Sequence, residues 1–139
     1  MFTKLKDYFN KQPRIGTLST SGKDGKVDVA YFGSPRMIDG KTVVMAVRKN
    51  QTFTNLQENP HAVFMILEQA STAPGWKGVR VYLKMVDSQT AGEKLDMMKK
   101  AIAEKAGEET AKSMHAALTF EITAVRPLMD VGQGWEKSI

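Results

Sequence analysis

The stretch that decides the fold is residues 42–67, which read TVVMAVRKNQTFTNLQENPHAVFMIL. An apolar strand at Thr42–Val47 leads into a basic, amide-rich turn and a short helix at 52–58, which Asn59 and Pro60 end before an apolar strand at 61–67. The first backbone N–H groups of a helix have no intrahelical partner, and the helix dipole adds partial positive charge at the same end. The stretch therefore predicts a site for an anion, such as the phosphate of a cofactor.

The predicted phosphate turn consists of Arg48, Lys49, Asn50, Gln51 and Thr52. The first two residues supply positive charge, and the other three supply side-chain hydrogen-bond donors at the first helical turn. A second role fits the same pattern, because Asn50 and Thr52 are good N-cap residues and Thr54 with Gln57 matches a capping box. The local pattern leaves ligand binding and simple capping both open.

The rest of the chain alternates helix and strand patterns. Apolar residues at helical spacing predict a leading helix at 3–12, and strands follow at 14–20 and 27–38 around a turn that contains Gly and Asp. Asp39 and Gly40 form a turn before strand 42–47. Alternation predicts a strand at 79–85, and helical spacing predicts a long helix from residue 90, interrupted at Gly107, before a last strand at 117–125. The methionines of this helical region, Met97, Met98 and Met114, are expected in the core.

These elements predict a single domain, residues 1–139, that is mainly β with flanking helices. Six antiparallel strands are expected to form a barrel, with a short helix after the third strand and a longer helix before the last. Strand 61–67 is apolar without alternation, which is typical of a strand buried on both faces. This is more buried surface than a single small barrel needs, so we expect a homodimer.

The composition narrows the possible chemistry. The chain has no cysteine and two histidines, which argues against a metal site or a thiolate nucleophile, and no sequence motif for a nucleophilic side chain is present. No catalytic residue can be named, so any reaction is expected to depend on a cofactor. The net charge of +5 is spread among acidic residues, which makes nucleic-acid binding an unfavoured alternative. No segment has the length and apolarity of a membrane helix or a signal-peptide core, and a cytoplasmic protein is expected.

The order of these elements and the segment 47–60 resemble the pyridoxamine 5′-phosphate oxidase-like flavin-binding split-barrel family. The resemblance spans nearly the whole chain and implies a split barrel that binds flavin mononucleotide (FMN) at a dimer interface. It implies that the phosphate lies at the predicted phosphate turn, although Gln51 and Thr52 are neutral where many family members carry an Arg-Lys pair. Further positive charge is then expected from Lys77, beside Gly78, of a partner subunit. The isoalloxazine ring is expected along two strand segments, formed by Tyr31, Phe32 and Gly33 and by Met45, Ala46 and Val47.

The resemblance also implies an FMN-dependent oxidoreductase with a nicotinamide or protein electron donor. Oxidation of pyridoxamine phosphate itself is not expected, because residues 126–129 do not resemble the C-terminal segment of the true oxidases. The alternatives are a flavin-binding or electron-relay protein without catalysis, and a family member that uses a deazaflavin or haem. Trp76 and Trp135 are expected to cover the flavin or to anchor an interface.

Overall fold

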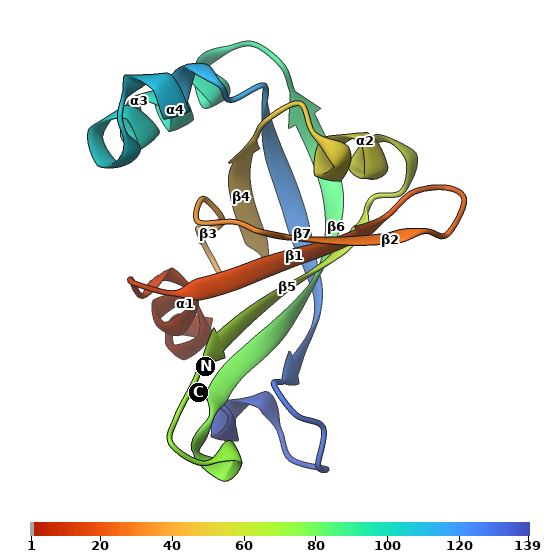
Figure 1. The fold of residues 1–139 in the computed structure, drawn as a ribbon, viewed down its shortest axis with the longest axis vertical. Helices are drawn as coiled ribbons and strands as arrows, with labels where there is room; N and C mark the ends of the chain where they lie inside the picture. The colour runs from red at the N-terminus through yellow and green to blue at the C-terminus, as the bar shows by residue number, and fades with distance from the viewer. Residues whose placement is uncertain (1) are drawn as a thin grey trace.

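A single antiparallel sheet forms the centre of the computed structural model, which describes residues 2–139 (Figure 1). Its strands follow the order β2-β1-β5-β6-β7-β4-β3. Their bounds are β1 Ile15–Ser21, β2 Val27–Tyr31, β3 Arg36–Met37, β4 Thr42–Val47, β5 His61–Glu68, β6 Lys77–Gln89 and β7 Ala116–Pro127. The long strands β6 and β7 bend around the sheet, with shifts of register after Tyr82 and Met85.

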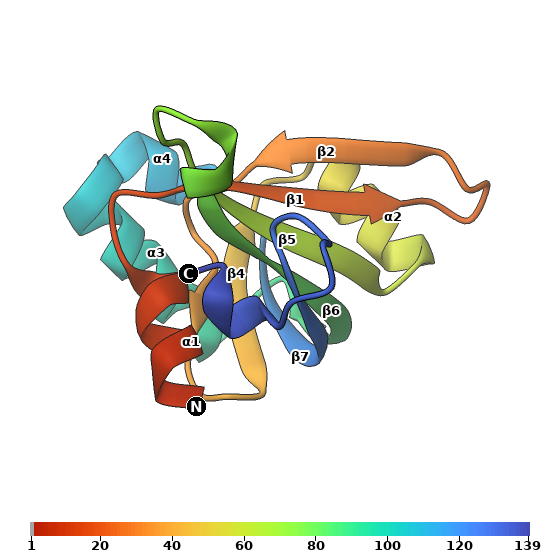
Figure 2. The same ribbon diagram turned by 90° about the horizontal axis from the view of Figure 1, so that it is seen from below.

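The helices lie around the sheet rather than in a layer of their own (Figure 2). Their bounds are α1 Phe2–Asn10, α2 Gln51–Glu58, α3 Glu93–Ala106 and α4 Glu108–Lys112, with 3₁₀ turns η1 at Ala73–Gly75 and η2 at Trp135–Lys137. Gly107 separates α3 from α4, as predicted, and its φ of 95° is a conformation that favours glycine. None of the helices in the described part of the chain has the length and apolarity to cross a membrane.

The predicted fold class is confirmed, but the sheet has seven strands rather than six. The predicted strand 27–38 is divided: β2 pairs with β1, the chain leaves the sheet at 32–35, and β3 pairs with β4. Pro35 cannot donate a backbone hydrogen bond, which favours a break at this point. Since β2 and β3 stand at opposite ends of the strand order, the segment 32–35 connects the two edges of the sheet.

The core lies between the concave side of the sheet and α1, and its largest fully buried side chains include Phe9, Phe64 and Phe120. Strand β5 buries only one face within the chain, because Phe64 is buried while Val63 and Met65 on the opposite face are half-buried. The expectation of burial on both faces is therefore not met by one chain alone. Met97 is 64% exposed, and Met98 and Met114 are half-buried outside the core cluster, so the predicted place of these methionines in the core was wrong.

The half-buried side of β5 continues across its neighbours as an apolar surface, which we call the outer face. Paired residues of an antiparallel sheet point to the same side, and the register aligns Thr17 with both Tyr31 and Met65. The outer face comprises Ile15, Val27, Val29, Tyr31, Val63, Met65 and Tyr82. Val29 is 62% exposed and Tyr31 65% exposed, an unusual concentration of open apolar side chains.

Candidate functional site

The predicted phosphate turn joins β4 to α2, and its polar side chains are largely occupied by the protein. Asn50 is the N-cap of α2, and its side-chain oxygen accepts a 3.0 Å hydrogen bond from the Phe53 N–H. Gln51 donates to the Asn55 side chain at 2.8 Å, and Thr52 is only 2% exposed. The capping role foreseen for Asn50 is thus present in the structure, and the two cationic side chains of the turn, Arg48 and Lys49, are exposed.

Two residues of the turn carry charge that no carboxylate balances. Arg48 and Lys49 are exposed, and neither forms an ion pair with any of residues 2–139. They lie immediately before α2, where the first helical N–H groups and the helix dipole also favour negative charge. This set of donors suits a phosphate group.

The turn has neighbours that the sequence did not reveal. Arg48 Nε donates to Ser113 Oγ at 2.8 Å, and the backbone N–H of His115 donates to the Val47 carbonyl at 2.8 Å. The His115 ring packs edge-on against Phe53 with 4.9 Å between ring centroids. These residues stand more than 60 positions from the turn in sequence, and no local motif connects them to it. The C-terminal end of α4 and the start of β7 therefore form one wall of the turn.

The two segments predicted to hold a flavin ring differ in their accessibility. Tyr31 and Gly33 are exposed and Phe32 is half-buried, whereas Met45, Ala46 and Val47 are buried in the core. The strands β2 and β4 are not neighbours in the sheet, but Ser34 Oγ donates to the Ala46 carbonyl at 3.0 Å and brings the segments together. The side chain of Tyr31 in the first segment is therefore open to solvent, whereas the second segment is covered.

Lys77 and Gly78 lie at the opposite end of β5 and β6 from α2. Glu68, the last residue of β5, pairs with Lys77, whereas His61 at the other end of β5 follows α2 by two residues. The seven steps between these ends amount to roughly 23 Å at about 3.3 Å per residue. Within one chain Lys77 is therefore remote from the phosphate turn.

Gly78 has a structural reason to be glycine. Its φ is +157°, and a Cβ atom there would lie 2.1 Å from the Ile66 carbonyl oxygen. Its N–H donates to the Ser138 carbonyl at 2.8 Å, and its own carbonyl accepts from Ser138 Oγ at 2.7 Å. Gly78 thus connects the sheet to the C-terminal segment.

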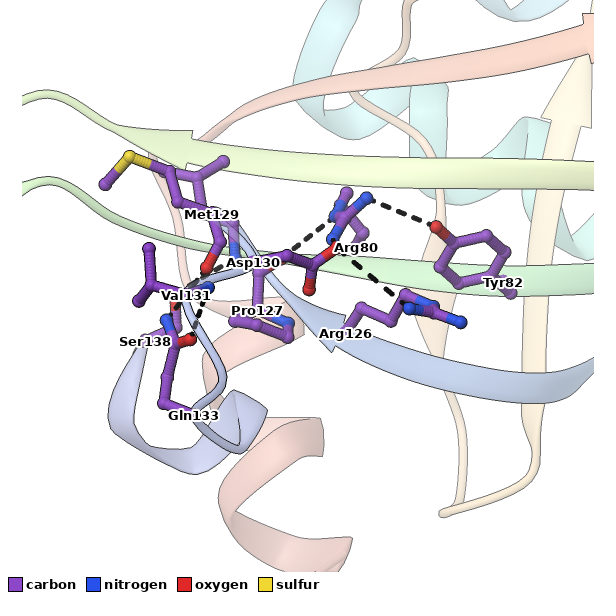
Figure 3. A network of polar contacts seen from close by, with 10 residues as sticks. Arg80, Tyr82, Arg126, Pro127, Met129, Asp130, Val131, Gln133 and Ser138 are labelled. Atoms are coloured by element: carbon purple, nitrogen blue, oxygen red, sulfur yellow. Dashed lines mark hydrogen bonds and ion pairs between the residues drawn. The ribbon is translucent and has the colours of Figure 1, made fainter.

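A second cationic group lies on β6 and β7 near the outer face (Figure 3). Arg80 contacts Asp130 at 2.5 Å, the Pro127 carbonyl at 2.9 Å and the Tyr82 hydroxyl at 3.3 Å. Arg126 stacks over the Tyr82 ring at 5.7 Å from its centroid and lies 4.0 Å from Asp130. Two arginines share a single carboxylate, so this end of the outer face carries a net positive charge.

The two tryptophans have separate surroundings. Trp76 donates through Nε1 to the Ala70 carbonyl at 2.9 Å and closes the loop between β5 and β6. Trp135 in η2 is half-buried and packs against the hydrophobic core. Both remain partly accessible to a second chain.

Comparison with models of protein families identifies the family of this chain. The sequence model described as pyridoxamine 5′-phosphate oxidase matches residues 2–129. The chain belongs to this family. The predicted family and the split-barrel fold are thereby confirmed. No curated protein matches the sequence.

The names of solved structures with a similar fold refer to different cofactors. An FMN-binding protein from Syntrophomonas wolfei subsp. wolfei is 26% identical, with a TM-score of 0.78, over 92% of this chain and 86% of that chain. HutZ, the haem storage protein from Vibrio cholerae, is 18% identical, with a TM-score of 0.57, over 88% and 91% of the two chains. An F420 reductase is 13% identical, with a TM-score of 0.63, over 86% and 94%. The latter two likenesses show the shared fold alone.

Proposed function

We propose that this protein is a homodimer that binds FMN at the subunit interface and acts in a redox reaction. The observation that carries the proposal is the 26% identity to an FMN-binding protein across 92% of the chain. The unbalanced charges of Arg48 and Lys49 at the start of α2 support it independently, because a phosphate needs such a site.

The chain's own residues divide into a phosphate end and a ring end. At the phosphate end, Arg48 and Lys49 provide charge, and the backbone N–H groups of the first turn of α2 provide directed donors. At the ring end, Tyr31 and Phe32 provide aromatic surface, and the exposed backbone of Gly33 permits close approach. FMN, when bound, would supply the hydride or electron transfer that no side chain of this protein offers.

The outer face supports the homodimer. Four of its apolar side chains, Ile15, Val27, Val29 and Tyr31, are more than half exposed in a single chain. Burying apolar surface contributes about 25 cal/mol per Å², and symmetric pairing is the commonest way in which a chain covers such a face. Tyr31 belongs both to the outer face and to the ring end, so a partner that covers this face also encloses the ring. Lys77 of the partner subunit is the proposed additional contact for the phosphate.

Replacing Val29 by aspartate tests the interface. The change places a charge in the middle of the outer face, and we expect a monomer by light scattering together with at least tenfold weaker FMN binding, the size of about 1.4 kcal/mol. Met97→Asp is the matched control, because Met97 is equally exposed but lies on α3. It should change neither property. If the Val29→Asp protein stays dimeric, the outer face is not the dimer interface. If it is a monomer with unchanged FMN affinity, the FMN site does not depend on that interface.

The proposed redox role has two alternatives, a protein that binds flavin without catalysis and a protein that uses another cofactor, and both can be tested on the purified protein. Reduction of the bound flavin by NADH or NADPH, with turnover, supports an oxidoreductase; binding without reduction supports a storage or electron-relay protein. Gln51 and Thr52 carry no charge for a phosphate, and both interact with other residues of the protein. A deazaflavin or haem is therefore the alternative cofactor. If either is the true cofactor, titration with it should give a spectral shift where titration with FMN gives none. The cytoplasmic location predicted from the sequence stays a prediction, which cell fractionation would test.

A further inference from the structure

Arg14 is a buried arginine with no carboxylate partner. It is 9% exposed, and it forms no ion pair with any residue in the described range 2–139. Its guanidinium lies 5.1 Å from the ring centroids of both Phe9 and Phe64. Burial lowers the pKa of Arg14 below its usual value, because the charged form loses hydration. A guanidinium in such a place needs compensation from hydrogen bonds and from the electron-rich ring faces.

The compensation comes from three backbone carbonyl groups. Arg14 Nη1 donates to the Phe9 carbonyl at 2.6 Å, and Nη2 donates to the carbonyls of Gly33 at 3.1 Å and of Pro35 at 2.5 Å. Nε has no hydrogen-bond partner among the described residues. The fork of the guanidinium therefore ties the end of α1 to the segment 33–35, and a lysine cannot reproduce that geometry.

The segment held by Arg14 follows the exposed Tyr31 and the half-buried Phe32. Residues 32–35 cross between the two edges of the sheet. Besides the bonds from Arg14, the Phe32 N–H donates to the Gly16 carbonyl at 3.0 Å, and Ser34 Oγ donates to the Ala46 carbonyl at 3.0 Å. Phe32 also packs against the core, and Pro35 is buried. On the far side, the Asn10 side chain exchanges hydrogen bonds with the Met37 backbone at 2.8 and 2.9 Å. Arg14 thus fixes the middle of a crossing whose two ends are fixed separately.

We propose that Arg14 is a positioning residue for the ring end of the cofactor site, which it acts on by holding the carbonyls of Gly33 and Pro35. This inference rests on the proposed function. A segment held in its binding conformation loses less conformational entropy when a ligand binds, so fixing 33–35 strengthens binding without any contact between Arg14 and the ligand. Because the effect concerns the ring, it should change the affinities for FMN and for riboflavin, which lacks the phosphate, by similar factors.

The test compares Arg14→Met, Arg14→Lys and the control Leu83→Ala, which removes buried surface on β6 away from the segment. Amide hydrogen exchange is measured without ligand, for a peptide covering residues 31–37. Exchange in Arg14→Met should be at least about tenfold faster than in Leu83→Ala, with each protein held the same number of degrees below its melting temperature. FMN and riboflavin should each bind about tenfold or more weakly to Arg14→Met, and Arg14→Lys should fall between it and the wild type. If Arg14→Met does not fold, Arg14→Lys carries the comparison.

The outcomes are distinct. If Arg14→Met lowers the melting temperature while exchange at 31–37 and both affinities match the control, Arg14 merely stabilises the core and the proposal is overturned. If only FMN binding is weakened, the effect belongs to the phosphate and the proposal is also overturned. If the wild type binds neither flavin, the proposed function fails, and the exchange result alone then decides whether Arg14 holds the segment.

Discussion

Replacing Arg48 and Lys49 together by alanine should weaken FMN binding strongly while the fold remains intact. Both side chains are exposed, and within residues 2–139 the one hydrogen bond that either side chain forms is that from Arg48 to Ser113, at 2.8 Å. The free energy of unfolding should therefore change by less than about 0.5 kcal/mol. The proposed site places both cations at the FMN phosphate, so the cost falls on binding.

The size of that cost follows from charge and exposure. A pair of unit charges about 4 Å apart in a high-dielectric setting gains about 1 kcal/mol, and a phosphate monoester carries about −1.5 to −2 charges at neutral pH. Each cation then contributes about 1.5 to 2 kcal/mol, and loss of both costs about 3 to 4 kcal/mol, or roughly 150- to 900-fold in affinity. Salt screens exposed charges, so the titration should be made at low ionic strength.

Calorimetric titration with FMN and with riboflavin isolates the phosphate contribution. The double variant should lose affinity for FMN and keep the wild-type affinity for riboflavin. Lys23→Ala with Lys26→Ala is the matched control, since both lysines are exposed, lie in the turn between β1 and β2, and change the net charge equally. If the double variant binds FMN like the wild type, or if the control loses as much affinity, the phosphate turn has been assigned to the wrong place.

Three further variants test the cap of α2, the backbone at Gly78 and the burial of Tyr8. Asn50→Ala removes the N-cap of α2 and should cost about 1 kcal/mol, seen as a melting temperature about 2 to 4 °C lower; no change would show that the cap is not formed. Gly78→Ala should abolish soluble, folded expression, because its Cβ would lie 2.1 Å from a backbone oxygen; a folded variant with native circular dichroism would contradict the strand pairing there. Burial, with the charge of Glu68 nearby, raises the pKa of Tyr8 well above its usual value, so the folded state loses stability as pH rises past about 10, where the unfolded tyrosine ionises. Tyr8→Phe should lessen this alkaline loss in a melting series from pH 8 to about 11, and an unchanged slope would refute it.

The sequence predicts well those elements whose signals are local. Strand β4, helix α2 with its end at Asn59, and the interruption at Gly107 all depend on residues within a few positions of each other. The spacing of apolar residues shows which face of a strand or helix is buried, but it does not show whether the same chain or a partner covers that face. The second face of strand β5 is only half-buried in the single chain, so its burial on both faces stays a prediction that depends on a partner.

The features that the sequence could not reveal are contacts between distant segments. The break in the predicted strand 27–38 depends on Pro35, which is visible in the sequence, and on the hydrogen bonds from Arg14, which are not. Ser113 and Arg48 are 65 positions apart, and no local sequence pattern predicts the hydrogen bond between them. The involvement of Thr52 in the protein interior likewise follows from packing rather than from its place in a capping pattern.

The most direct test of the central claim is the visible absorption spectrum of the purified protein after incubation with FMN and desalting. We predict a flavin spectrum that stays with the protein fraction, at about one flavin for each chain as a symmetric dimer requires, and a flavin fluorescence quenched by the neighbouring aromatic side chains. A colourless protein fraction, with all of the FMN in the small-molecule fraction, would contradict the claim that this chain binds FMN.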